Sequence, residues 1–377
     1  MNLASHLKTE KIKDSKSGRI YFPELDVLRF LAFSMVFLDH SLGSFGSSTQ
    51  SSPLLQALSA GGGLGVPIFF ALSAFLISYL MMREIENTGT VNLRAFYVRR
   101  VLRIWPLYFL ALFFCFFVVG FFPKAGHFTL SDLLAYLFFY GNLHTAFHYY
   151  LPLGGGVLWS LCVEEQFYLV WPAIVKLGGK LAIVCVSILM WIVSQFATKM
   201  LCGVHGVGGN YVWCNTLTHL QYFGIGALLS VLFYGRASRI PLMLRGLFIV
   251  GGFTLFFLFP EQWRNSNDYY AYLVAGIGIV LVMVGLLGVS LPKFCGFFKY
   301  LGKISYGLYV YHLWWISLIF FFYKHFISRA CGAPLFWVQC FVAMPLSIVV
   351  AHFSYKWFES PFLRLKERFE VVRSRPV

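Results

Sequence analysis

The chain has 377 residues, of which 59% are hydrophobic and only 12% are charged. Soluble domains carry about 25% charged residues, and the mean hydropathy here is +0.72. This composition excludes an ordinary soluble protein and indicates an integral membrane protein. The formal net charge of +15 is typical of a cytoplasmic membrane face in contact with anionic lipid, so we predict a membrane-lipid partner and no nucleic-acid partner.

The apolar segments predict how the chain crosses the membrane. A transmembrane helix needs about 20 apolar residues to span roughly 30 Å of hydrocarbon. No cleavable signal peptide is visible before the first such segment, so we expect that segment to remain as a helix. The predicted helices lie at 25–43, 61–82, 103–122, 157–175, 181–198, 215–234, 245–260, 270–290, 304–324 and 334–356.

An eleventh apolar segment lies near 130–142, and the distribution of cations decides whether it crosses. If it does not cross, most of the 30 Lys and Arg residues fall on the cytoplasmic side, as the positive-inside rule requires. We therefore predict an all-α polytopic membrane protein with ten transmembrane helices, both termini cytoplasmic, and a re-entrant or surface segment near 130–142. The predicted division is a cytoplasmic segment 1–24, a transmembrane domain 25–358 and a cytoplasmic tail 359–377.

The first predicted helix contains LDVLRFLAFSMVFLDH, with Arg29 and His40 in an otherwise apolar run. Eleven residues at 100° per residue return to within about 20° of the same face, roughly 16 Å further along the axis. Each residue alone could be an interfacial anchor, and Arg29 could pair locally with Asp26. Ionisable groups on one stripe inside a membrane favour a polar path instead.

Three arginines precede the third predicted helix in RAFYVRRVLRIWP, at Arg99, Arg100 and Arg103. The positive-inside rule alone could explain them. However, arginine is the residue suited to bidentate phosphate contacts. A cytoplasmic polyphosphate ligand is therefore a second explanation.

Two adjacent carboxylates lie in LWSLCVEEQFYLVWP, at Glu164 and Glu165. Neighbouring helical residues point about 100° apart, so at most one of them aims squarely at a given site. They could pair structurally with other polar groups. The functional alternative is a carboxylate that orients a neighbouring histidine and raises its basicity.

Taken together, these motifs resemble the acyltransferase family 3 membrane proteins, which acylate bacterial surface glycans. The resemblance rests on Arg29 and His40 in an Arg, ten residues, His pattern and on Arg100-x-x-Arg103. It also rests on the segments GVPIFFALSAFLI (65–77), LWSLCVEEQFYLVWP, ISYGLYVYH (304–312) and FESPF (358–362). The motifs occur in order over residues 25 to 362. One departure is Ala74, where the family often has glycine.

The resemblance implies an O-acetyltransferase in the bacterial inner membrane that uses cytoplasmic acetyl-CoA as acyl donor and needs no metal. It implies that Arg100 and Arg103, helped by Arg29 and Arg99, bind the donor's phosphates. Ser305 and Tyr306 are further predicted donor contacts, although they could instead cap the start of their helix.

On the acceptor side, the resemblance implies that His40 acts as general base or carries the acyl group, with Glu164 orienting it. Trp159, Glu165 and His312 are the predicted acceptor contacts. Trp159 could also be an interface anchor and His312 a hydrogen-bonded core residue. The expected acceptor is a glycan hydroxyl, such as one of lipopolysaccharide O-antigen.

Two other functions fit the polar residues of the membrane segments. A secondary transporter would use Arg29, His40 and Glu164 as an ion path, but the sequence shows no repeat symmetry. A glycan flippase would share the glycan but need no coenzyme site. The Arg100 and Arg103 pair distinguishes both from an acyltransferase.

Overall fold

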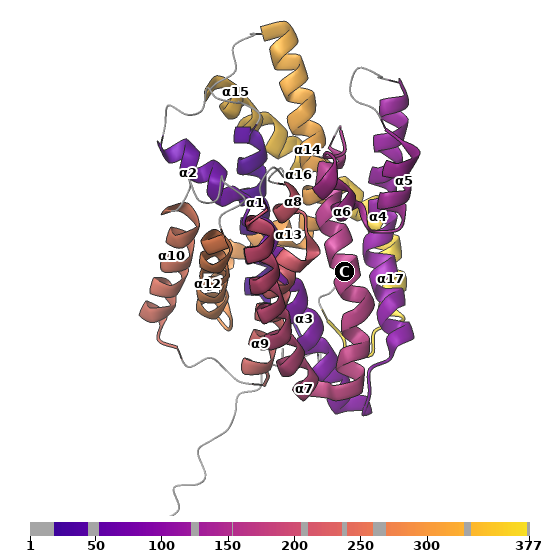
Figure 1. Cartoon of the computed structure of the whole chain (residues 1–377), viewed down its shortest axis with the longest axis vertical. Coiled ribbons are helices and arrows are strands. Elements are labelled where there is room, and N and C mark those ends of the chain that lie inside the picture. The colour runs from indigo at the N-terminus through magenta and orange to yellow at the C-terminus, as the bar shows by residue number, and fades with distance from the viewer. Residues whose placement is uncertain are drawn as a thin grey trace, which may run out of the picture.

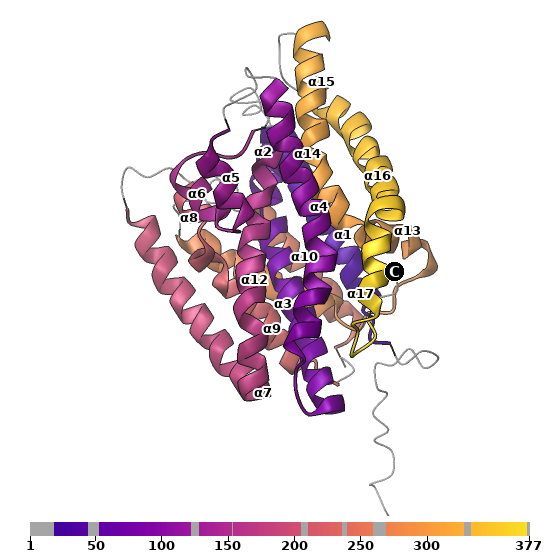
Figure 2. The same cartoon turned by 90° about the vertical axis from the view of Figure 1, so that its right-hand side faces the viewer.

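The computed structural model describes residues 19–43, 53–121, 128–152, 154–204, 210–235, 240–258, 269–327 and 333–374. Within these ranges all regular structure is helical and no strand occurs, so the predicted all-α fold is confirmed. Figures 1 and 2 show that most long helices run roughly along the long axis of the molecule. Residues 1–18 of the predicted cytoplasmic segment 1–24 lie outside the described residues.

The helices follow one another closely along the chain. The first half contains α1 (Pro23–Gly43), α2 (Pro53–Gly62), α3 (Gly65–Thr88), α4 (Leu93–Phe121), α5 (Leu130–Leu137), α6 (Gly141–Phe147) and α7 (Leu158–Cys202). The second half contains α8 (Asn210–Trp213), α9 (Thr216–Leu232), α10 (Leu242–Leu258), α12 (Tyr269–Leu286), α13 (Gly296–Lys303), α14 (Ser305–Phe322), α15 (Ala333–Val338), α16 (Met344–Phe353) and α17 (Ser360–Glu367). Short π-helical turns join α15, α16 and α17 into one rod.

Six helical stretches among the described residues are long and apolar enough to cross a membrane: Gly65–Thr88, Leu93–Phe117, Gly155–Cys202, Tyr269–Leu286, Ser305–Ile327 and Leu335–Glu367. Two more apolar helices, Thr216–Leu232 and Leu242–Phe257, are shorter. Helix α1 has 21 residues, but Asp26, Arg29 and Asp39 make it more polar than these. The count of ten spans and the cytoplasmic position of both termini stay predictions.

Helix α7 covers two of the predicted spans, 157–175 and 181–198. Its 45 residues are interrupted at Gly179, whose φ of 55° and ψ of −139° are not helical. This left-handed φ is accessible to glycine because it has no Cβ. Figure 2 shows the two arms of α7 meeting at the lower end of the view. The interruption at Gly179 therefore divides α7 into two separate rods, one for each predicted span.

Helix α4 begins ten residues before the predicted start at 103. Asn92 caps it, since its side-chain oxygen accepts a hydrogen bond from the Ala95 amide at 3.0 Å, which satisfies one otherwise unpaired donor. The expectation that Arg99 and Arg100 precede the helix is therefore wrong. Both lie within it, so their side chains have positions fixed by helical geometry.

The segment near 130–142 folds as two short helices, α5 and α6, separated at Phe139, which has a φ of 58°. Thr129 and Asp132 form a capping box at the start of α5, which fixes where that helix begins. Its eight residues extend only about 12 Å. Neither helix can cross a bilayer alone, as expected of a re-entrant or surface segment.

Close helix contacts hold α1 in the middle of the molecule. A Cβ placed on Gly302 of α13 would lie 1.7 Å from the Asp26 carbonyl oxygen of α1, and one on Gly65 of α3 would lie 2.1 Å from the Ala32 oxygen. No side chain fits at these distances, so glycine allows both helices to touch the α1 backbone. Helix α17 lies beside α4, as Figure 2 shows.

Candidate functional site

A cavity of about 210 Å³ lies where α1, α3, α4, α7, α14 and α17 meet. The cavity is highly charged, because five cations and four carboxylates line it. They are Arg29, Arg99, Arg100, Arg103, Lys366, Asp26, Glu84, Glu164 and Glu370. Aliphatic and aromatic side chains make up most of the remaining wall. Four guanidinium groups and an ammonium gathered in an apolar bundle are the arrangement expected for an anionic ligand.

All six residues that the sequence predicted as donor contacts line this one cavity: Arg29, Arg99, Arg100, Arg103, Ser305 and Tyr306. They come from α1, α4 and α14, which are far apart in the chain. Since α4 begins at Leu93, its three arginines occupy the second and third helical turns. The structure thus gathers these residues at one place.

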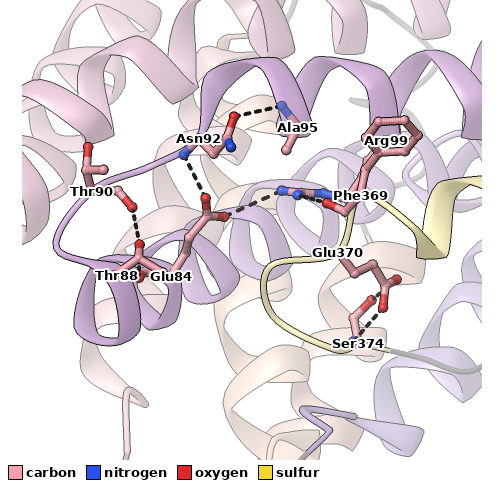
Figure 3. Close-up of polar contacts among 9 residues, drawn as sticks. All are labelled: Glu84, Thr88, Thr90, Asn92, Ala95, Arg99, Phe369, Glu370 and Ser374. Atoms are coloured by element: carbon pink, nitrogen blue, oxygen red, sulfur yellow. Dashed lines mark hydrogen bonds and ion pairs between the residues drawn. The ribbon is translucent and has the colours of Figure 1, made fainter.

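Two of the arginines are held by buried carboxylates. Arg29 Nη1 lies 2.6 Å from Asp26 Oδ1, and the Tyr21 hydroxyl donates to the other Asp26 oxygen at 2.8 Å. The local pair considered for Arg29 is therefore present, and Arg29 also faces the cavity. Arg99 Nη2 lies 3.5 Å from Glu84 Oε2, as Figure 3 shows.

Arg100 is held by aromatic rings. Its guanidinium carbon lies 5.1 Å from the centre of the Tyr168 ring and 5.4 Å from that of Phe96. Such cation–π contacts fix the plane of a guanidinium. Tyr168 itself is fixed, because its hydroxyl lies 2.5 Å from Ser73 Oγ. Arg100 is thereby presented to the cavity in a defined orientation.

Ser305 and Tyr306 do not cap helix α14. The residue at the cap position is Ile304, and no side-chain cap hydrogen bond is present. Ser305 is buried but lines the cavity, and the Tyr306 hydroxyl donates to the Ile104 carbonyl of α4 at 2.8 Å. Tyr306 therefore joins α14 to the helix that carries the arginines.

The two adjacent glutamates point to different surroundings, as their helical spacing requires. Glu164 lines the cavity with the arginines. Glu165 accepts a hydrogen bond from the Trp105 indole at 3.3 Å, and its other oxygen is buried without a hydrogen-bond partner. Glu165 is not among the described residues that line the cavity, so only Glu164 shares a site with the arginines.

His40 lies near the other end of α1 and contacts a second histidine, His312 of α14. Its Nδ1 lies 2.8 Å from His312 Nε2, and the two rings are stacked at 17° with centres 5.1 Å apart. His312 Nδ1 in turn lies 2.7 Å from the Tyr309 carbonyl oxygen. The family resemblance implied that Glu164 orients His40, whereas in the structure His312 contacts His40 Nδ1. Local sequence could not pair residues 272 positions apart.

The hydrogen bonds assign a tautomer to each ring. A carbonyl oxygen only accepts, so His312 Nδ1 carries a hydrogen and Nε2 of the neutral ring is an acceptor. His40 Nδ1 must then donate to it, which leaves the lone pair of neutral His40 on Nε2. His312 has no exposed surface, and a buried charge is costly, so the neutral form fits its position. His40 Nε2 is therefore the basic nitrogen.

Tyr309 and Ser160 separate the cavity from the histidine pair. Both line the cavity, and Ser160 Oγ lies 2.7 Å from the Tyr309 hydroxyl. The Tyr309 ring also contacts the His312 ring, with centres 5.7 Å apart. The described residues lining the cavity do not include His40. The Tyr309 side chain is thus the wall between the two polar regions.

Trp159 does not offer an exposed ring to a sugar. Only 4% of the residue is exposed, because its ring packs against Trp213 and His219 with centres 6.0 and 5.6 Å away. The ring does not form an exposed stacking surface in this structure, and a sugar contact by Trp159 stays a prediction. Trp159 has the burial of a core residue.

Several residues of the site were missed from the sequence. Tyr168, Ser73, Tyr309 and Ser160 all lie within the quoted motifs, but nothing in their local sequence distinguished them from the other polar residues there. Lys366 lies in the predicted tail 359–377. The signal that could have found it is FLRLKERFE, where apolar residues at helical spacing indicate a helix that packs against the bundle.

The order of these residues along the chain matches a known family. Residues 22–355 match the acyltransferase domain of acyltransferase family 3. No solved structure matches the chain. A Staphylococcus aureus (strain COL) protein named "Putative O-acetyltransferase" is 26% identical over 98% of this chain and 61% of its own length.

A second relative is the peptidoglycan O-acetyltransferase OatA of Listeria monocytogenes serovar 1/2a. It is 25% identical over 93% of this chain and 57% of its own length. The chain thus spans about three fifths of the length of these curated relatives. The family match covers the arginines of the cavity and both histidines, and the chain therefore belongs to acyltransferase family 3.

Proposed function

We propose that the protein is an O-acyltransferase of the bacterial inner membrane that transfers acetyl from cytoplasmic acetyl-CoA to a hydroxyl of a surface glycan on the periplasmic side. One observation carries this proposal. Helix α1 joins a cavity lined by arginines, at Arg29, to a neutral histidine pair at His40. Eleven residues separate the two, roughly 16 Å along the axis, which is comparable to the length of a pantetheine arm.

The arginine cavity suits the nucleotide end of the donor. Coenzyme A carries several phosphate charges, and guanidinium groups bind phosphate oxygens through paired N–H donors. Arg100 is already oriented by Tyr168, and Arg29 by Asp26. Prior orientation lowers the entropy lost on binding. We assign Arg29, Arg99, Arg100 and Arg103 to the phosphates, and Ser305 and Tyr306 to the wall beside them.

The histidine pair suits proton transfer. His40 Nε2 takes the proton of the acceptor hydroxyl while the hydroxyl oxygen bonds to the thioester carbonyl carbon. The carbon–sulfur bond then breaks, and the thiolate takes up the proton as free coenzyme A leaves. His312 holds His40 in the required tautomer and accepts from its Nδ1 throughout. An acetyl group carried on the same His40 nitrogen is the alternative route.

The identity of the acceptor glycan is a more specific proposal. We propose a surface polysaccharide such as lipopolysaccharide O-antigen. The Listeria relative OatA is named a peptidoglycan O-acetyltransferase, which makes peptidoglycan the second candidate. Glu164 was predicted to orient His40, and Trp159, Glu165 and His312 were the predicted acceptor contacts. His312 Nε2 lies 2.8 Å from His40 Nδ1. Neither a transporter nor a flippase is favoured by the family match.

The proposal is tested with membranes that contain the full chain and acetyl-CoA labelled in its acetyl group. We expect label in a glycan fraction, and mass spectrometry of O-antigen and of peptidoglycan from cells with and without the gene identifies which gains an acetyl group. Arg103→Ala membranes should lose most of the label. If wild-type membranes transfer no label to any glycan and Arg103→Ala leaves the glycans unchanged, the proposal fails.

A further inference from the structure

The last described stretch of the chain forms part of the arginine cavity. Lys366, Glu370, Val372 and Ser374 all line it. The Arg99 guanidinium donates to the Phe369 carbonyl at 2.7 Å, as Figure 3 shows. This hydrogen bond links α4 to the segment that follows α17. The segment is therefore a wall of the cavity.

A second contact ties this wall to the start of α1. The Ile20 amide donates to the Arg373 carbonyl at 2.9 Å, and Ile20, Tyr21 and Phe22 line the same cavity. Residues from both ends of the described chain thus meet beside the arginines. Any ligand that reaches Arg99 and Arg100 lies against this double segment.

Lys366 is the buried cation of this cavity wall. It is only 7% exposed, and its ammonium lies 3.0 Å from Glu370 Oε1. It shares the cavity with Arg100 and Arg103. A buried ammonium near two guanidinium groups is unfavourable unless an anion compensates it. Glu370 is the anion that pairs with it in this structure.

The three ion pairs of the cavity differ in how firmly their carboxylates are fixed. Asp26 lies in α1 and also accepts from the Tyr21 hydroxyl. Glu84 lies in α3 and also accepts a hydrogen bond from the backbone N–H of Asn92 at 2.7 Å. Glu370 follows the end of α17, and its additional partner is Ser374 of the same segment. Asp26 and Glu84 are therefore structural, whereas Glu370 can turn away without disturbing a helix.

We propose that Lys366 is a further phosphate-binding residue of the donor site. Glu370 pairs with the Lys366 ammonium until the donor's phosphate takes the place of the Glu370 carboxylate. This inference rests on the proposed use of acetyl-CoA. The phosphate replaces one carboxylate by a group of higher charge, so binding is favoured by all the neighbouring guanidiniums as well. The segment after α17 thus belongs to the donor site.

The test measures coenzyme A binding to the purified full chain in detergent. Lys366→Met should raise the Kd about tenfold, the loss typical of one charge-assisted hydrogen bond. Arg364→Met is the matched control, because Arg364 is an exposed cation of the same helix and lies outside the cavity lining. It should change the Kd less than twofold. Lys366→Arg keeps the charge and should retain binding within a few-fold.

Glu370→Gln tests the displacement. Removing the competing charge should lower the Kd for coenzyme A by about two- to fivefold. A raised Kd would show that Glu370 positions Lys366 for the ligand, and the displacement would be overturned. An unchanged Kd in Lys366→Met, with a melting temperature equal to that of wild type, would overturn the phosphate role itself.

A second probe, 3′-dephospho-coenzyme A, identifies which phosphate is bound. If Lys366→Met weakens coenzyme A but not this analogue, Lys366 contacts the 3′-phosphate. Equal weakening of both supports contact with the diphosphate. Failure of the proposed function is seen separately, as wild-type protein that neither binds coenzyme A nor transfers labelled acetyl. Wild type that does both, with Lys366→Met unchanged, refutes only the Lys366 assignment.

Discussion

The arginine end and the histidine end of α1 place polar groups in an apolar bundle in opposite ways. At the arginine end, charges are kept and paired: Asp26 holds Arg29 at 2.6 Å. At the histidine end, in the described part of the chain, the His312 ring pairs with His40 and a backbone carbonyl rather than with a carboxylate. Retained charge suits the binding of a polyanion. Neutral imidazoles suit the uptake of a proton.

Substitution of His40 should have the largest effect on acetyl transfer. His40→Ala should lower acetyl transfer at least about 100-fold, since general bases contribute roughly 10²- to 10⁴-fold, and should leave the Kd for coenzyme A unchanged. Transfer is measured with labelled acetyl-CoA and binding by calorimetry. If the substitution weakens coenzyme A binding as much as Arg103→Ala does, the two ends do not have separate roles.

Arg103 should show the reverse pattern. Arg103→Ala is expected to raise the KM for acetyl-CoA about 10- to 100-fold, the loss of one or two charge-assisted hydrogen bonds, with a much smaller change in kcat. Arg94→Ala is the control, because Arg94 is an exposed arginine of the same helix outside the cavity lining. A drop in kcat alone would contradict a binding role for Arg103.

Substitution of His312 tests whether its hydrogen bond orients His40. His312→Ala should lower kcat about tenfold or more without raising the KM for acetyl-CoA, because His40 loses the acceptor that fixes its tautomer. His312→Gln should recover part of the activity, since its amide oxygen can accept from His40 Nδ1. Equal loss in both variants, with unchanged thermal stability, would argue against orientation through that hydrogen bond.

Trp159 should show the smallest effect on activity. Trp159→Phe is expected to leave the KM for the acceptor unchanged, because the ring is covered by Trp213 and His219. It should lower the free energy of unfolding by about 1–2 kcal/mol, less than the 3–5 kcal/mol of truncation to alanine. The melting temperature and the acceptor KM are measured together. A raised acceptor KM at unchanged stability would restore the sugar-stacking role.

Much of the fold was predictable because membranes impose a simple length rule on apolar segments. The helices around Arg29, Glu164 and His312 were all expected near their observed positions. The start of α4 was missed by ten residues, since RAFYVRRV is too polar to resemble a membrane segment. The resemblance to a known family also led us to group the six predicted donor contacts, which line one cavity; their binding of the donor stays a prediction.

What the sequence determined by itself was the chemistry available: an apolar helical chain with Arg29 and His40 on one face of α1. Only the tertiary structure decided the partners. Helix packing brought His312 to His40 over 272 residues, buried Trp159, and set Lys366 beside the arginines. Composition and periodicity act over a few turns of one helix. Contacts between distant helices depend on how all the surfaces pack together.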